Sequence, residues 1–169
     1  MISKRMEGEI NKQINAEIYS AYLYLSMEAY FNSVNLKGFA NWMNVQVQEE
    51  MSHARIFFDY LDERDGRAEL FAIETPPKEW KSPLDVFEAT YGHEQKITAL
   101  INNLMSIAVE EKDYATTSKL QWFVDEQVEE EGNDVKIIEE LKLVGEGGSG
   151  MFMLDRELSQ RTFTPPVTG

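Results

Sequence analysis

The stretch Val45–Leu61 (VQVQEEMSHARIFFDYL) carries the pattern from which the rest of the chain can be interpreted. Its apolar residues recur at intervals of three and four, which is the period of a helix with one buried face. Glu50 and His53 are three residues apart and fall on that same face, with Gln46 one turn earlier. A carboxylate buried alone is costly, so Glu50 must be paired, protonated or bound to a cation. The group that satisfies it has to be sought elsewhere in the chain.

The composition excludes several classes of protein. A chain of 169 residues is long enough for one domain, 1–169, with a substantial core. The absence of cysteine excludes disulfides, thiolate chemistry and iron–sulfur clusters. A formal charge of −14 with no run of Lys and Arg argues against nucleic acid. Such a surface attracts small cations, although solubility alone also explains it.

The sequence gives no sign of a membrane partner. Its N-terminus, MISKRMEGEINKQ, lacks the apolar stretch of a signal peptide, and no apolar run is long enough to span a bilayer. We therefore expect a cytoplasmic protein.

Hydrophobic periodicity predicts an all-α chain with four long helices and a short fifth one. Ser82 followed by Pro83 marks the start of one helix, and Asp113 can cap the next. The predicted helices cover residues 3–34, 38–65, 83–111, 113–144 and 151–160.

The connection at 67–82 sets the topology. A helix of about 28 residues is about 42 Å long, and residues 67–82 span roughly 53 Å when extended. A tight turn would need far fewer residues. The links between the first and second and between the third and fourth helices are short, which favours antiparallel hairpins. We predict a four-helix bundle of two antiparallel hairpins joined by one long crossover, with a short C-terminal fifth helix.

Each long helix interrupts its apolar face with polar residues near its middle. Counted from the end where the first helix starts, the glutamates lie roughly 21 to 26 Å along the bundle at 1.5 Å per residue, so they share one layer. A bundle with up-down-up-down connectivity would also place these glutamates at about the same height. Their common height therefore does not by itself prove the crossover. The fourth helix has three such positions, Asp134 among them. The set of candidate ligands is Glu17; Glu50 and His53; Glu94; Gln127 and Glu130.

Four carboxylates and one imidazole inside an apolar core repel one another unless cations neutralise them. Oxygen ligands with one histidine nitrogen suit iron or manganese, with zinc as an alternative. Four carboxylates balance two divalent ions and can bridge them, so a dinuclear site is predicted. A single glutamate is more often a solvated residue, and E-x-x-H arises by chance on acidic helices. The specificity comes from four helices that place these residues at one level.

Four segments of the chain resemble the non-haem ferritins of bacteria and archaea, which are ferritin-like di-iron carboxylate proteins. They are INAEIYSAYLYLSM, FANWMNVQVQEEMSHA, EKDYAT and WFVDEQVEEE. The resemblance covers about residues 2–163. It implies iron storage and detoxification by a ferroxidase that oxidises Fe(II) to Fe(III) with dioxygen. It also implies a hollow homo-oligomeric shell of 24 subunits, inside which ferric mineral is deposited.

The resemblance assigns roles to the candidate ligands. It implies two irons per subunit, the first bound by Glu17, Glu50 and His53. The second would use Glu50 as a bridge, together with Glu94 and Glu130.

Further residues match the family's site by position. Tyr24 matches a tyrosine beside the irons, and Gln127 a glutamine near them. A possible third iron would be bound by residues that would otherwise be read as solvated, namely Glu49, Glu126 and Glu129.

The sequence departs from related families at two positions. Gln127-x-x-Glu130 stands where bacterioferritins and di-iron oxygenases repeat E-x-x-H. The second iron is therefore expected to have carboxylates without histidine and to exchange more readily. Ser52 stands where bacterioferritins carry the haem-ligating methionine, so no haem is expected.

Two other functions fit part of the pattern. A di-iron peroxidase or oxygenase without storage predicts a small oligomer, a substrate pocket and usually a second E-x-x-H. A structural bundle without metal leaves the four glutamates unexplained. The apolar residues of the crossover and of the fifth helix are expected at subunit contacts, with packing against their own bundle as the alternative.

Overall fold

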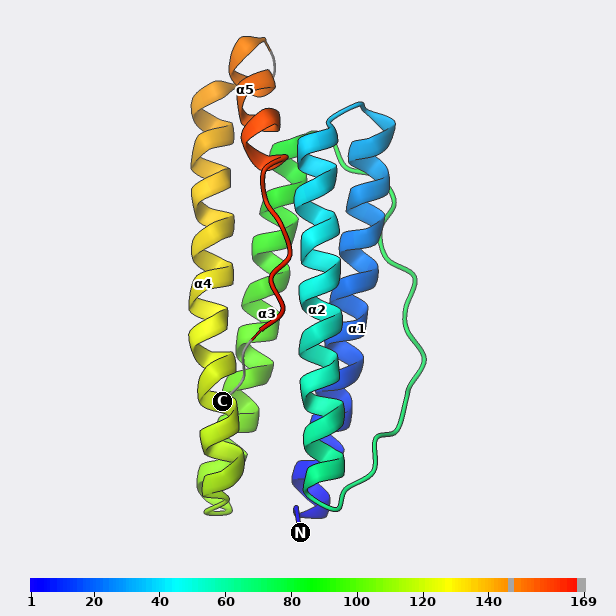
Figure 1. The fold of residues 1–169 in the computed structure, drawn as a ribbon, viewed down its shortest axis with the longest axis vertical. Helices are drawn as coiled ribbons and strands as arrows, with labels where there is room; N and C mark the ends of the chain where they lie inside the picture. Colours follow the sequence, from blue (N-terminus) through cyan, green and yellow to red (C-terminus); the bar gives the residue numbers. More distant parts are fainter. Residues whose placement is uncertain (146–147, 167–169) are drawn as a thin grey trace.

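The chain forms a bundle of four long helices with a short fifth helix against one end (Figure 1). The structure is a computed structural model and describes residues 1–145 and 148–166. This architecture confirms the predicted fold class, and each helix end lies within two residues of its predicted position. The helices are α1 (Lys4–Ser33), α2 (Lys37–Glu63), α3 (Pro83–Glu110), α4 (Tyr114–Val144) and α5 (Ser149–Leu158).

Side-chain caps fix where three of the long helices begin. Ser3 Oγ accepts a hydrogen bond from the Met6 amide at 3.0 Å, and Ser82 Oγ accepts one from the Asp85 amide at 3.1 Å. Asp113 does the same for Thr116 at the start of α4. These bonds satisfy amide groups that have no partner inside the first helical turn. Asp113 is therefore the cap that the sequence predicted, whereas Ser3, predicted as the first residue of its helix, is the cap of α1.

The crossover runs beside α1 from the end of α2 to the start of α3 (Figure 1). Asn11 holds it at one end, where its Nδ2 donates to the Arg67 carbonyl at 2.9 Å and its Oδ1 accepts from the Glu69 amide at 2.7 Å. Ser26 Oγ donates to the Pro77 carbonyl at 2.6 Å further along. Because the crossover returns the chain to the other end of the bundle, α2 and α3 run in the same direction.

Two apolar clusters fill the bundle, one toward each end. One contains Phe31, Phe39 and Phe87. The other contains Phe57 and Phe123, whose rings stack with centroids 4.0 Å apart. The predicted polar layer belongs to neither cluster and lies between them. None of the helices described is long and apolar enough to cross a membrane.

The fifth helix caps the start of α2, which has no side-chain cap of its own. Asp155 Oδ1 accepts hydrogen bonds from the amides of Gly38 at 2.8 Å and Phe39 at 3.1 Å. A Cβ at position 38 would lie 1.5 Å from the carbonyl oxygen of Asp155, so this approach requires glycine. Beyond α5, Asn41 Nδ2 donates to the carbonyl of Arg161 at 2.9 Å and holds the tail against α2.

Replacing Asp155 with alanine is expected to lower the free energy of unfolding by about 1–2 kcal/mol, because two helix-terminal amides lose their acceptor. Thermal unfolding of the purified protein measures the change. Glu157→Ala on the same helix removes a side chain that is 65% exposed and serves as the control. Equal melting temperatures for the two variants would contradict the capping role.

Candidate metal centre

Five acidic and histidine side chains from the four long helices meet between the two apolar clusters. They are between 1% and 3% exposed, so their charges are removed from water. The structure thus brings into one layer the residues that the sequence singled out, which are Glu17 on α1, Glu50 and His53 on α2, Glu94 on α3 and Glu130 on α4.

Three potential metal ligands lie close together on the α1–α2 side of this layer. Glu17, Glu50 and His53 each offer one ligand atom, and these atoms lie within 4.8 Å of one another. His53 Nδ1 is 3.4 Å from Glu50 Oε2. Gln13 Nε2 donates to Glu17 Oε1 at 2.8 Å, whereas Glu17 Oε2 has no hydrogen-bond partner among the described residues. A buried acceptor in this state is suited to a cation.

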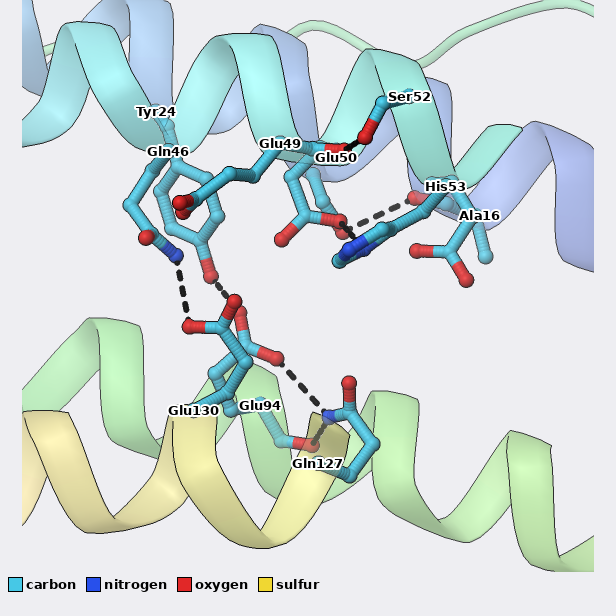
Figure 2. Close-up of polar contacts among 12 residues, drawn as sticks. Ala16, Tyr24, Gln46, Glu49, Glu50, Ser52, His53, Glu94, Gln127 and Glu130 are labelled. Atoms are coloured by element: carbon cyan, nitrogen blue, oxygen red, sulfur yellow. Dashed lines mark hydrogen bonds and ion pairs between the residues drawn. The ribbon is translucent and has the colours of Figure 1, made fainter. Parts of the chain in front are cut away.

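The α3–α4 side is arranged differently, as Figure 2 shows. Glu94 accepts hydrogen bonds from the Tyr24 hydroxyl and, at 3.1 Å, from Gln127 Nε2. Glu130 Oε2 accepts from Gln46 Nε2 at 3.0 Å. Amide and hydroxyl donors thus hold these two carboxylates. Tyr24 and Gln127 both contact Glu94. The new element is Gln46, which the sequence placed in the apolar face without a partner.

Burial raises the pKa of every carboxyl in the layer, because a low-dielectric core disfavours the charged form. The pKa of Glu17 rises to about 7. The pKa values of Glu50 and Glu130 rise well above the ordinary range, through burial and then through neighbouring carboxylates. The neighbouring Glu17 carboxyl adds to the rise in the pKa of Glu50. The metal-free layer therefore holds protons that a divalent cation would displace.

His53 is kept in the form that a metal needs. Burial lowers its pKa to about 4, so the imidazole is neutral at physiological pH and has a free nitrogen lone pair. Its ring meets the edges of Trp122 and Phe123, with centroids 5.5 and 5.9 Å away. Carboxylate oxygens with one such nitrogen fit iron, manganese or zinc.

The residues named for a third iron are not part of the compact ligand group, since among the described residues only Glu17, Glu50 and His53 bring three such atoms within 4.8 Å of one another. Glu49 and Glu126 are half-buried and Glu129 is exposed. Burial raises the pKa of Glu49 and of Glu126, and the charge of Glu129 raises both further. Arg161, which the sequence did not indicate, donates to Glu49 Oε2 from Nη2 at 2.6 Å. We call Glu49, Glu126 and Glu129 the outer acidic cluster.

One further carboxyl lies one helical turn beyond Glu130. Asp134 is 1% exposed, and neither of its carboxyl oxygens has a hydrogen-bond partner among the described residues. Burial, followed by the charges of Glu94 and Glu130, raises its pKa to about 9. The helical spacing placed Asp134 on the apolar face, but the pattern assigned it no ligand role. It is a protonated acid at neutral pH.

Buried carboxylates from four helices around one neutral histidine form a site that can hold a metal ion, which is the arrangement of metal sites in the cores of four-helix bundles. The chain belongs to the ferritin family, since the sequence profile of the ferritin-like domain matches residues 7–144. This confirms the resemblance drawn from the sequence.

Individual relatives agree with the family over nearly the whole chain. The chain is 44% identical over 161 residues to a bacterial non-heme ferritin of Bacteroides fragilis, covering 95% of this chain and 100% of the relative. It is 42% identical over 156 residues to one of Campylobacter jejuni, with 92% and 93% covered.

Solved structures show the same fold. An engineered closed form of Archaeoglobus fulgidus ferritin is 55% identical and has a TM-score of 0.95, covering 97% of this chain and 100% of that one. An open-pore ferritin from the same archaeon is 55% identical with a TM-score of 0.94, at 95% and 98% coverage.

Proposed function

We propose that this chain is the subunit of an iron-storage ferritin whose buried centre oxidises Fe(II) with dioxygen. The observation that carries the proposal is the group Glu17, Glu50 and His53, with ligand atoms within 4.8 Å of one another at the level of Glu94 and Glu130. The relatives named as non-heme ferritins support it, because they match 95% and 92% of the chain.

In this proposal Fe(II) is the substrate and the side chains supply charge and position. The first Fe(II) binds to Glu17, Glu50 and His53, and its arrival releases the protons that burial keeps on the carboxyls. The second uses Glu50 as a bridge with Glu94 and Glu130, and Gln127 can offer its amide oxygen. Each Fe(II) loses one electron and dioxygen accepts them. Carboxylates favour the higher charge of Fe(III), so they help to drive the oxidation.

The two sides of the centre differ in a way that suits transfer to a store. A cation at Glu94 and Glu130 competes with the hydrogen bonds that Gln127 and Gln46 donate to these carboxylates, and it finds no histidine there. We therefore expect the second iron to be held more loosely than the first. Tyr24 donates to Glu94 and positions that carboxylate from the opposite side.

The surface of the single chain supports a homo-oligomeric shell. Tyr22, Leu25 and Met51 are between 46% and 48% exposed and line an apolar hollow between α1, α2 and the crossover. On α5, Phe152 and Met153 are 62% and 70% exposed. We propose that these surfaces pack against other copies, with 24 subunits per shell. The cytoplasmic location stays a prediction.

Aerobic addition of Fe(II) to the purified protein tests the function. Oxygen uptake reports oxidation, and the iron that co-elutes with protein on gel filtration reports storage. We expect a large assembly that retains far more iron than its binding sites hold. Rapid oxidation with retention of only the iron bound at the centre would instead support a di-iron oxygenase or peroxidase. No oxygen uptake would contradict both.

A further inference from the structure

We infer that Thr98 and Glu131 are positioning residues for the second iron, because together they fix the orientation of the Gln127 side-chain amide. The amide nitrogen is held against Glu94, and the amide oxygen is left to face the interior of the layer. The inference rests on the proposed function, since it takes Glu94 and Glu130 as ligands of the second iron. Neither Thr98 nor Glu131 was assigned a role at the metal centre from the sequence.

Three oxygen atoms surround the amide nitrogen of Gln127. Its Nε2 lies 3.1 Å from Glu94 Oε2, 3.4 Å from the Glu94 carbonyl oxygen and 3.3 Å from Thr98 Oγ1. A backbone carbonyl can only accept a hydrogen bond, whereas a threonine hydroxyl can either donate or accept one. The Thr98 hydroxyl would therefore suit either end of the amide, unless its single hydrogen is used elsewhere.

Glu131 takes up that hydrogen. The Thr98 hydroxyl donates to Glu131 Oε1 at 2.5 Å, a length typical of a hydroxyl bonded to an ionised carboxylate. An ionised carboxylate has no hydrogen to return, so Thr98 Oγ1 can only accept from Gln127. The amide atom that faces Thr98 must then be the nitrogen. Because Thr98 lies on α3 and Glu131 on α4, the packing of these two helices sets the orientation of the amide.

The reverse orientation of the amide would lose each of these contacts. The Gln127 oxygen would face the carboxylate and the carbonyl of Glu94 and the hydroxyl oxygen of Thr98, and none of these would offer it a hydrogen. Glu94 would keep its hydrogen bond from the Tyr24 hydroxyl and lose the one that α4 supplies. The observed orientation is therefore the one that the surrounding groups favour.

This orientation places the amide oxygen where a cation can use it. Figure 2 shows the oxygen of Gln127 directed away from Glu94, toward the side of the layer that carries Glu50 and His53. An amide oxygen is a neutral ligand for a cation, whereas the NH₂ group only donates hydrogen bonds and would repel one. Thr98 and Glu131 thus decide which end of the Gln127 amide the second iron meets.

A simpler role for Thr98 and Glu131 would be to tie α3 to α4. Loss of either residue would then loosen the bundle and weaken both iron positions alike. The positioning role predicts a loss confined to the second position. Thr98→Val keeps the shape and removes the hydroxyl, and Glu131→Gln removes the acceptor that commits its hydrogen. Thr98→Ser keeps the hydroxyl and should restore the wild-type behaviour.

The experiment titrates Mn(II), which takes carboxylate and carbonyl oxygens as ligands, into the metal-free protein and its variants by calorimetry under nitrogen. We expect Thr98→Val and Glu131→Gln to bind the second Mn(II) about fivefold more weakly than the wild type. Each variant loses one hydrogen bond that favours the binding-competent amide, so the reversed amide is populated and must turn before the ion binds. The affinity for the first Mn(II) should stay within about twofold of the wild type.

Two further variants and a crystal structure sharpen the test. The double variant Thr98→Val/Glu131→Gln should be no weaker than either single variant, because both residues act through one hydrogen-bond chain. Thr117→Val on α4 removes a hydroxyl that donates to the Asp113 carbonyl at 3.0 Å, and it should leave both affinities unchanged. In wild-type crystals soaked with Mn(II), anomalous diffraction should place the second ion in contact with Gln127 Oε1.

Several results would overturn the inference. They are wild-type affinity for the second Mn(II) in Thr98→Val, equal losses at both positions, no rescue by Thr98→Ser, and a second ion that does not contact Gln127. A wild-type protein that binds both Mn(II) ions as expected but oxidises no Fe(II) would instead count against the proposed function alone.

Discussion

Replacing Glu50 with alanine is expected to slow Fe(II) oxidation at least about a hundredfold, since even residues that merely orient a metal ligand change activity by 10–100-fold when removed. Glu50 offers a ligand atom within 4.8 Å of those of Glu17 and His53, and it is the residue that both irons would share. Its loss removes one ligand from each of the two proposed iron sites at once. The fold should survive, because a buried carboxyl with a raised pKa contributes little to stability.

Stopped-flow measurement of Fe(II) oxidation in the first turnovers tests this prediction for the Glu50 site. Glu139→Ala is a matched control, because Glu139 lies on α4 with its side chain 67% exposed. Glu50→Gln keeps the shape while removing the charge, and should be slow as well. An unchanged rate in Glu50→Ala would remove the basis for the proposed centre.

Asp134→Asn is expected to stabilise the metal-free protein at neutral pH and to flatten the dependence of its stability on pH. The pKa of Asp134 is about 9 in the folded chain, against an ordinary value of 3.8. The folded state therefore binds more protons than the unfolded state between these values, and stability falls as pH rises from about 4 to about 9. Asparagine takes up no proton, so this loss disappears. We expect a gain of about 2–4 kcal/mol at neutral pH that shrinks toward pH 4.

Scanning calorimetry of the metal-free protein across this pH range measures the effect of Asp134. The quantity compared is the slope of unfolding free energy against pH in the wild type and in the variant. The buried carboxyls of the inner centre contribute equally to both slopes, so the difference between them reports Asp134. Asp125→Asn, at an exposed position on the same helix, should follow the wild-type curve. Parallel curves for wild type and Asp134→Asn would show that Asp134 is ionised or hydrated in the fold.

The layer of ligands was predictable because a helix has a fixed rise and period. Glu17, Glu50, Glu94 and Glu130 could be placed at one level without knowing how the helices pack. The resemblance implied that Glu17, Glu50 and His53 share one iron, but the sequence did not reveal the amide and hydroxyl donors that hold Glu94 and Glu130. Their positions depend on side-chain rotamers and on which neighbour Gln46 contacts, and neither has a periodic signal.

The contacts of the C-terminal segment could not be predicted for a related reason. Arg161 and Glu49 are 112 residues apart, and Asp155 and Gly38 are 117 apart. The tail that follows α5 has no hydrophobic period to indicate which helix it follows. Its path is decided by tertiary contacts such as the hydrogen bond from Asn41 to the Arg161 carbonyl.

The long crossover divides the centre between two parts of the chain that leave the ribosome at different times. The first hairpin alone contains Glu17, Glu50 and His53, so it carries all the residues proposed to bind the first iron before α3 exists. Glu94 and Glu130 arrive with the second hairpin, once the crossover has carried the chain back along α1. The two halves of the centre are thus synthesised in the order in which the irons are expected to bind. A metal ion can link the two hairpins only after both have been synthesised.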